Sequence, residues 1–285
     1  MKIGIIGSGK VGISIGYVMK KRGLDIIGTS DIKKAQLDVA RRYLGNDCIY
    51  TTDNSEIVKS SDIIGITTQD GEIEKVAKEI FKSFKTVKNK LFFHTSGAHP
   101  SSILSPLEEK GAILGSLHPL QTFPDIDSAI DVLPGTYIFI EGDKKALKLL
   151  EFLGTHIGYK VVTIEGKNKV LYHLSAVFVC NLLCALLYAG EGIMDRIGIE
   201  LEPFFPIINA TLKNIETKGP LMSLTGPVIR GDVGTIIDHI EAMSSMKLQK
   251  RIYKALSLAA LDLVKKRKVL DKEVLERLKR VLEEI

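Results

Sequence analysis

The most constraining feature of this sequence is a glycine pattern that follows its first apolar segment. Residues 2–6 are predicted to form a strand buried on both faces, and a Gly-x-Gly-x-x-Gly pattern comes directly after it. Gly7 would make the tight turn, Gly9 would let the backbone approach a pyrophosphate, and Gly12 would let the next helix pack on the strand. The N–H groups at the start of that helix would face the phosphates, so the pattern predicts dinucleotide binding. The residues of this predicted cofactor turn are Gly7, Ser8, Gly9, Lys10, Val11 and Gly12.

Strand-like and helix-like segments alternate through the first part of the chain. Strands are expected at 2–6, 24–29, 48–51, 62–67, 90–94, 112–116, 136–141 and 160–164. This alternation predicts an α/β fold with a doubly wound, mostly parallel sheet of the Rossmann type. Only helical segments follow, near 168–197, 202–217, 232–244, 246–267 and 271–284. We therefore predict a dinucleotide-binding domain over 1–165 and an all-helical domain over 166–285.

The end of the second strand bears on which dinucleotide is bound. An acidic residue there would hold the ribose 2′-OH of NAD. The strand ends at Thr29 and Ser30, Asp31 follows, and lysines stand at 33 and 34. Hydroxyl groups with a lysine suit a 2′-phosphate, so we expect NADP, held by Thr29, Ser30 and Lys33 or Lys34. NAD is the alternative if the Asp31 carboxylate turns inward.

Ligands of an open parallel sheet bind beyond the carboxyl ends of its strands. Three strand ends are rich in polar residues, and the candidates there are Thr67, Thr68 and Thr95 for the cofactor and Ser96, His118 and Gln121 for the substrate. For His94 and His118, a hydrogen-bonded core or surface histidine is the alternative. The histidines lack the spacing of a metal site, and no Gly-x-Ser-x-Gly elbow indicates a hydrolase.

The first helix after the sheet carries polar residues on an apolar background. His173 and Asn181 can share one side of it, about 12 Å apart along the axis. Inward-facing polar groups are costly unless paired, so both are candidates for a crevice between the domains; hydrogen bonding within the helical domain is the alternative. The apolar run 174–189 is shorter than the about 20 residues of a membrane span. We expect a buried central helix, with Cys180 and Cys184 in its core.

Composition bears on location and partners. Hydrophobic residues make up 45% and charged residues 26%, as in ordinary soluble proteins. The net charge is +5, and Lys247–Ile285 alone has twelve Lys or Arg against six Asp or Glu. We interpret this excess as solvated helix faces, because a nucleic-acid tail would interleave aromatic residues. Three cysteines without a CxxC pair, and a strand that begins at Lys2, predict a cytoplasmic protein without signal peptide, nucleic-acid or membrane partner.

Five motifs together resemble one family. They are Gly7–Gly12, His94–Gly97, Ser116–Phe123 (SLHPLQTF), Tyr172-His173 and Thr225–Asp232 (TGPVIRGD). Over nearly its whole length the sequence resembles the Rossmann-like family that carries domain of unknown function 2520, the short-subunit dehydrogenase-like oxidoreductases. The resemblance implies an N-terminal NAD(P) domain and a helical C-terminal domain through which homodimers form.

More distantly, the layout is similar to pyrroline-5-carboxylate reductases, ketopantoate reductases and β-hydroxyacid dehydrogenases. Those relatives often carry a catalytic lysine on the first helix after the sheet, with asparagines one and two turns later. Here His173 stands at the apparent lysine position, Val177 at the first asparagine and Asn181 at the second. This departure from the pattern of the relatives favours imine reduction, or a histidine as the general acid.

These observations lead us to expect hydride transfer between a nicotinamide and a small, anionic carbonyl or imine substrate. His118 and then His173 are the candidates for the general acid, because an unperturbed histidine has a pKa of about 6.5. Arg230 would clamp a carboxylate, with Asp232 holding it or capping the next helix. Side chains expected to orient the substrate are Ser96, Gln121 and Asn181. An NADP-binding redox sensor or partner protein without turnover is the rival function, and a deazaflavin reductase is a weaker one.

Overall fold

The computed structural model describes residues 1–284, which divide into two compact units, Met1–Val177 and the residues from Phe178 onward. The first unit therefore ends later than the predicted boundary at 165. The reason lies in helix α7 (Lys169–Ala176), whose first residue, Lys169, is buried in the first unit. Its ammonium donates a hydrogen bond to the carbonyl oxygen of Ser96. The start of the long apolar helix is thus part of the sheet domain.

The first unit is built on one eight-stranded sheet, which confirms the predicted doubly wound Rossmann-type fold. The strand order is β3-β2-β1-β4-β5-β6-β7-β8. The strands are β1 (Lys2–Ile6), β2 (Asp25–Ser30), β3 (Ile49–Thr51), β4 (Ile63–Ile66), β5 (Leu91–His94), β6 (Ile113–Pro119), β7 (Tyr137–Gly142) and β8 (Lys160–Thr163). All neighbours are parallel except β6 and β7. The chain order reverses between β1 and β4, the place where such sheets bind ligands.

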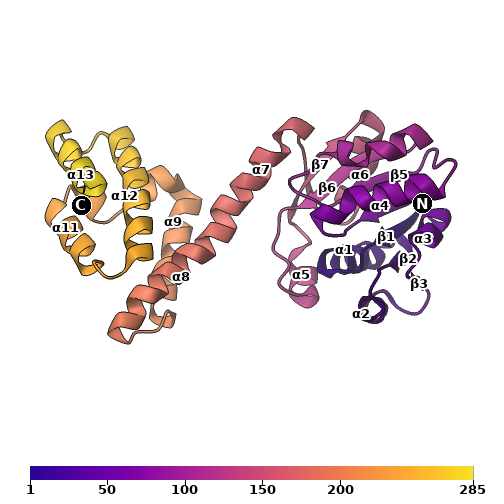
Figure 1. The fold of residues 1–285 in the computed structure, drawn as a ribbon, viewed down its shortest axis with the longest axis horizontal. Coiled ribbons are helices and arrows are strands. Elements are labelled where there is room, and N and C mark those ends of the chain that lie inside the picture. The colour runs from indigo at the N-terminus through magenta and orange to yellow at the C-terminus, as the bar shows by residue number, and fades with distance from the viewer. Residues whose placement is uncertain (285) are drawn as a thin grey trace. The chain divides into compact units, whose positions relative to one another are not determined.

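Helices cover both faces of this sheet (Figure 1). They are α1 (Lys10–Lys21), α2 (Lys34–Leu44), α3 (Asn54–Ser60), α4 (Asp70–Ser83), the 3₁₀ helix η1 (Ser101–Lys110), α5 (Ile126–Val132) and α6 (Lys144–His156). One apolar core joins α1 and α6 to the sheet, and another joins α3, α4 and η1 to it. Strands covered on both sides explain why the sequence shows apolar runs instead of alternation. Helix α5 was not predicted from the sequence.

The second unit has its own core. The first unit closes with η2 (Gly166–Asn168) and α7. The helices that follow are the π-helical turn η3 (Val177–Asn181), α8 (Leu182–Met194), η4 (Asp195–Ile197), η5 (Glu202–Phe204), α9 (Phe205–Ser223), α10 (Pro227–Arg230), α11 (Val233–Ala242), α12 (Lys247–Arg267) and α13 (Lys272–Glu284). Buried residues of α10 to α13 form this core, among them Ile236, Leu261 and Leu278.

The apolar helix that was expected in the core is exposed in the single chain. The helical stretch Gly166–Ile197 has a window of mean hydropathy 2.1, of which 0% is buried, and its length and composition alone would allow a membrane span. Phe178 and Val179 are 65% and 76% exposed, and Cys180 and Cys184 are exposed as well. The prediction of a buried central helix is therefore wrong for one chain, because α10 to α13 supply the core without it.

Candidate active site

The glycine turn after β1 has the geometry that its sequence predicts. Gly7 has a φ of 102°, a conformation that favours glycine. A Cβ at position 12 would stand 2.3 Å from both the Gly7 carbonyl oxygen and Thr67 Oγ1, so only glycine lets α1 approach this closely. A Cβ at position 9 would meet no atom within 4 Å. The space in front of α1 is therefore open, and the turn fits a pyrophosphate.

The first residues of α1 leave amide groups directed at this space. Helix α1 begins at Lys10, and its first-turn N–H groups have no acceptor within the helix. Lys10 Nζ donates to the carbonyl oxygen of Pro124 at 2.5 Å, while Val11 is half-buried. The first turn has no acidic residue, so it offers positive potential to a phosphate.

Thr29 and Ser30 are not where a 2′-phosphate could reach them. Thr29 Oγ1 and Ser8 Oγ lie 2.9 Å apart, and Ser30 Oγ donates to Asn54 Oδ1 at 2.7 Å. Both residues are buried, and buried hydroxyl groups satisfy their hydrogen bonds with neighbouring protein groups. The expectation that these two hydroxyls bind the cofactor is corrected accordingly.

The Asp31 carboxylate turns inward. Its Oδ2 accepts from the Ser8 backbone N–H and its Oδ1 from that of Lys33, both at 2.8 Å. It thereby ties the turn after β2 to the glycine turn, and it takes the orientation that would suit the ribose hydroxyls of NAD. The Lys33 side chain is exposed.

Three threonines line the ends of β4 and β5. Thr67 Oγ1 donates to the Gly7 carbonyl oxygen at 2.6 Å, which holds the glycine turn to β4. Thr95 is half-buried, and its backbone N–H donates to Ile66. Thr68 Oγ1 is buried without a hydrogen-bond partner among the described residues. Such an orphaned hydroxyl beside the turn is a group that a bound phosphate or ribose can satisfy.

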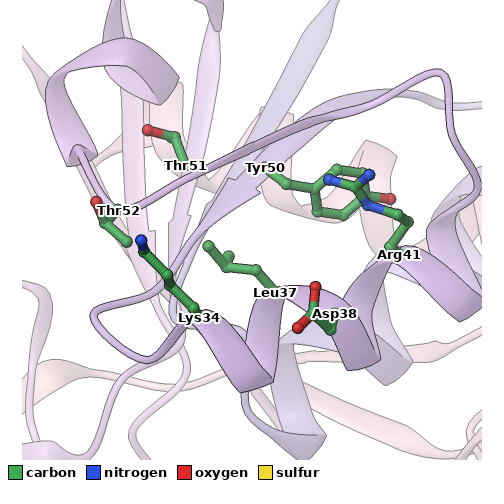
Figure 2. A pocket seen from close by; sticks show the side chains of 7 residues that line it. All are labelled: Lys34, Leu37, Asp38, Arg41, Tyr50, Thr51 and Thr52. Carbon is green, nitrogen blue, oxygen red and sulfur yellow. The ribbon is translucent and has the colours of Figure 1, made fainter.

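A hollow of about 350 Å³ lies between α2 and β3 (Figure 2). Its lining side chains come from one face of α2 and from the end of β3: Lys34, Leu37, Asp38, Arg41, Tyr50, Thr51 and Thr52. The Arg41 guanidinium lies over the Tyr50 ring, 4.8 Å from its centroid. Thr51 pairs with Ser30 in the sheet, which places the hollow next to the end of β2. Lys34 lines this hollow, whereas Lys33 does not.

A cluster of histidines forms where β5 and β6 end. His118 Nδ1 lies 2.7 Å from the Tyr172 hydroxyl, and the rings of His118 and His173 meet edge-on with centroids 6.2 Å apart. The structure thus brings both predicted general-acid candidates together, one from β6 and one from α7. Tyr172 also packs on Phe139, centroids 4.2 Å apart.

Gly97 is what allows the two histidines to approach the loop after β5. A Cβ at this position would stand 2.8 Å from His173 Nδ1 and 2.9 Å from His118 Nε2. The two ring nitrogens therefore lie close enough for one atom to contact both. His173 Nδ1 is buried without a hydrogen-bond partner within residues 1–284.

Lys169 is the residue that sequence reasoning underrated. Its side chain is 1% exposed, and its Nζ donates to the Ser96 carbonyl oxygen at 2.7 Å and to Ser116 Oγ at 2.8 Å. The only signal in the sequence is a lysine one turn before His173. A buried ammonium needs such partners because desolvating a charge is costly.

Two carboxylates complete the network around Lys169. Ser116 Oγ lies 3.3 Å from Glu141 Oε2, and Glu141 also accepts from the backbone N–H and the hydroxyl of Ser101. On the other side, Ser96 Oγ donates to Asp70 Oδ2 at 2.9 Å. The predicted substrate residue Ser96 is thus engaged with protein groups and braces the loop after β5.

Burial changes the protonation of this cluster. Desolvation, with the nearby Lys169 charge, lowers the pKa of His118 to about 4 and that of His94 to about 3. Desolvation also lowers the pKa of Lys169 to about 8, against the opposing effect of Glu141. Burial raises the pKa of the Tyr172 phenol. His118 and His94 are therefore neutral at pH 7. The expectation of a His118 with a pKa near 6.5 is corrected.

His94 is a structural histidine. Its Nδ1 accepts from the Ser96 backbone N–H, and its Nε2 lies 3.2 Å from the carbonyl oxygen of Pro100, which can only accept. Both ring nitrogens of a neutral imidazole are therefore used, and the ring is 0% exposed.

The other predicted substrate residues are exposed or engaged with protein groups of their own unit. Gln121 is exposed, and its side chain turns back to Thr122 and Thr136. Asn181 is an exposed residue of the second unit. Asp232 caps α11 by accepting from the Thr235 backbone N–H, and Arg230 lies 3.9 Å from it. Of the two roles predicted for Asp232, the structure thus shows the helix cap.

The two parts of the chain match two domain families. Residues 1–119 match a Rossmann-like domain, and residues 136–260 match the domain of unknown function DUF2520. The chain thus carries a Rossmann-like domain followed by a DUF2520 domain. The family that the five motifs resemble is therefore confirmed. No curated protein matches the sequence.

Solved structures share this fold. A Bacteroides fragilis protein described as an NADP oxidoreductase is 20% identical to this chain, with a TM-score of 0.76. The match covers 90% of this chain and 96% of that protein. The Thermotoga maritima protein TM1727 is 20% identical, with a TM-score of 0.72 over 93% and 99%. A reductive aminase of Aspergillus terreus, in complex with NADPH4, cyclohexanone and allyl amine, is 14% identical, with a TM-score of 0.66 over 99% and 92%. At these identities the likeness establishes the fold alone.

Proposed function

We propose that this protein is an NADP-dependent oxidoreductase that transfers hydride between the nicotinamide and a small carbonyl or imine substrate. One observation carries the proposal. The open glycine turn after β1 and the cluster of His118, His173 and Lys169 after β5 and β6 stand at the carboxyl edge of the same sheet. Dinucleotides bind across this edge at the point where the strand order reverses.

The residues of the turn fit the cofactor. Its pyrophosphate would lie against the first-turn N–H groups of α1, in the space that Gly9 leaves open, with Thr68 Oγ1 as a further partner. Lys34 and Arg41 in the hollow of Figure 2 would supply positive charge for a 2′-phosphate. Two of the similar proteins named above are described with NADP or NADPH, which supports NADP over NAD. Against it stands the inward Asp31 carboxylate.

When bound, the nicotinamide supplies or accepts the hydride, and the chain must supply the environment of the substrate. His118 and His173 offer ring nitrogens at the edge of the sheet, and the Lys169 ammonium behind them favours an anionic substrate. The roles of Asn181 and Arg230 as substrate ligands, and a substrate crevice between the two units, stay predictions.

Binding and turnover test this function in two steps. Calorimetric titration should give tight binding of NADPH, and a panel of small oxo acids, aldehydes, ketones and cyclic imines should then reveal turnover as a change in NADPH absorbance. Failure to bind either NADPH or NADH would overturn the proposal. Tight binding without turnover of any substrate would favour the alternative, an NADP-binding sensor or partner protein, to which the exposed apolar helix α8 would give a docking face.

A homodimer through the helical domain is part of the proposal. Large apolar side chains of α8 and α9 are exposed in the single chain, among them Leu182, Leu186, Phe205 and Ile207. Contiguous apolar surface of this kind marks protein interfaces. Light scattering should give twice the chain mass, and Leu182→Glu should shift it to the monomer. A monomeric parent protein would contradict the dimer.

We place the protein in the cytoplasm, where its free cysteines stay reduced.

A further inference from the structure

We propose that His118 contacts the substrate as a neutral hydrogen-bond donor, its Nε2–H directed at a carbonyl oxygen, with Tyr172 and Lys169 as positioning residues. The inference rests on the proposed function and narrows its substrate class to aldehydes, ketones and neutral imines, to the exclusion of iminium ions. It replaces the role of general acid that the sequence suggested for this histidine.

Tyr172 determines which ring nitrogen carries the proton. Its hydroxyl lies 2.7 Å from His118 Nδ1, and burial raises the pKa of the phenol, so the hydroxyl keeps its proton. A phenol is a stronger donor than an imidazole N–H, and an imidazole nitrogen is a stronger acceptor than a phenol oxygen. Tyr172 therefore donates to Nδ1, which leaves the hydrogen of the neutral ring on Nε2. Packing on Phe139 holds the tyrosine ring in place.

The charged groups around His118 keep it neutral. The ring is desolvated, and the nearby Lys169 ammonium and His173 oppose a further positive charge, while Asp70 acts in the opposite direction. Asp70 is half-exposed and already accepts from Ser96 Oγ. Lys169 itself is held by Ser96 and Ser116, with the Glu141 carboxylate behind Ser116. His94 and His99 lie in the same cluster, and His94 is neutral because of its burial.

Gly97 leaves the donor approachable. His118 Nε2 makes no hydrogen bond to the described residues, and it stands 2.9 Å from the place that a Cβ at position 97 would occupy. An alanine there would press on this nitrogen and on His173 Nδ1. Because Gly97 has no side chain, a small substrate atom can approach His118 Nε2 to contact distance.

The electron flow of the reduction fits a neutral donor. Hydride transfer forms a C–H bond at the carbonyl carbon, and the C=O π electrons become a lone pair on oxygen. The Nε2–H of His118 stabilises that negative charge, since donors preorganised toward a developing charge act most strongly in a desolvated site. The alkoxide then takes a proton from water, because a neutral imidazole is no acid at pH 7. An iminium nitrogen has no lone pair for this N–H, whereas a carbonyl oxygen or a neutral imine nitrogen has one, so the site disfavours iminium ions.

The tautomer can be tested without cofactor or substrate. Long-range ¹H–¹⁵N NMR correlations of histidine-labelled protein should show His118 as the Nε2–H form, unprotonated down to about pH 5. Tyr172→Phe should lose this preference while the chain stays folded. A His118 in the Nδ1–H form, or one that titrates near pH 6.5, would overturn the inference even if NADPH binds and the function holds.

Kinetics with the screened substrate test the donor itself. His118→Leu should lower kcat for a ketone by about 10²–10³, the usual effect of one such donor, and His118→Gln, which keeps an N–H, should recover part of it. The dissociation constant of NADPH should stay within about twofold in both. In the parent enzyme kcat/KM should not change with pH between about pH 5 and 7.5. If kcat/KM changes near pH 8, where Lys169 loses its proton, Lys169→Met should remove that change. A limb near pH 6.5 that disappears with His118, or faster turnover of a permanently charged iminium than of its ketone, would contradict the proposal.

Discussion

Lys169 Nζ donates to the Ser116 hydroxyl at 2.8 Å, and this bond joins the first turn of α7 to the end of β6. A cation that is 1% exposed is an unusual element of a sheet domain, since a buried ammonium is costly unless it is paired and hydrogen-bonded. Its position explains why the compact first unit extends to Val177. It also places one fixed positive charge beside His118 and His94.

Stability above pH 8 should report on Lys169. Its pKa is about 8 in the folded protein and 10.5 in the unfolded chain, so the unfolded state binds more protons between these values. The free energy of unfolding should therefore rise with pH from about 8 to 10.5, by up to about 1.4 kcal/mol per pH unit. Urea unfolding of parent and Lys169→Met at pH 7, 8, 9 and 10 measures this. Equal slopes for the two proteins would show that Lys169 keeps an ordinary pKa.

Stability in acid should report on His94. Its folded pKa of about 3 lies below the 6.5 of the free side chain, so only the unfolded state takes up the proton as the pH falls between them. Stability should be fully present above about pH 6.5 and be lost toward pH 3, with His118 contributing in the same direction down to about pH 4. In His94→Gln the unfolding free energy should fall less steeply over this range. Urea unfolding of the parent protein and of His94→Gln across this pH range measures the difference, and equal slopes would contradict the prediction.

Two glycines of the cofactor turn should respond differently to valine. Gly9→Val places a branched side chain in open space, so the fold should survive while NADPH affinity falls by about tenfold or more. The valine side chain of Gly12→Val would collide with the Gly7 carbonyl oxygen and Thr67. The free energy of unfolding should therefore fall by about 1–3 kcal/mol or more, the usual cost of overpacking. Calorimetry and thermal unfolding separate the two effects. Unchanged NADPH affinity in Gly9→Val would remove the turn from the cofactor site.

Two neighbouring lysines offer a matched test of cofactor choice. Lys34 lines the hollow beside the end of β2, whereas Lys33 is exposed outside it. Lys34→Ala should weaken NADPH binding by roughly tenfold, in line with about 1.5–3 kcal/mol for a hydrogen bond to a charged group, and leave NADH binding unchanged. Lys33→Ala should change neither.

Salt provides a check on the same prediction. The preference for NADPH over NADH should shrink as ionic strength rises, because charge contacts to a 2′-phosphate are partly screened. A parent protein that prefers NADH would instead assign the inward Asp31 carboxylate to the ribose hydroxyls of NAD.

Much of the fold follows from local signals in the sequence. The strand before Gly7, the glycine spacing and the alternation of apolar runs with helical segments predict each strand and most helices of the first unit to within a few residues. These features depend on period and on backbone conformation, which neighbouring residues determine. Helix α5 and the 3₁₀ form of η1, which contains Pro106, lack such a signal.

The sequence by itself determined a doubly wound sheet with a cofactor turn, and it named His118 and His173 as chemically suited residues. Only the tertiary structure decided their chemistry, because pKa values and hydrogen bonds depend on burial and on residues distant in the chain. Thr29 and Ser30 are turned inside, Asp31 faces the glycine turn, and a tyrosine 54 positions after His118 lies against its ring. Burial lowers the pKa of His118, and the nearby charge of Lys169, which no spacing rule predicts, lowers it further.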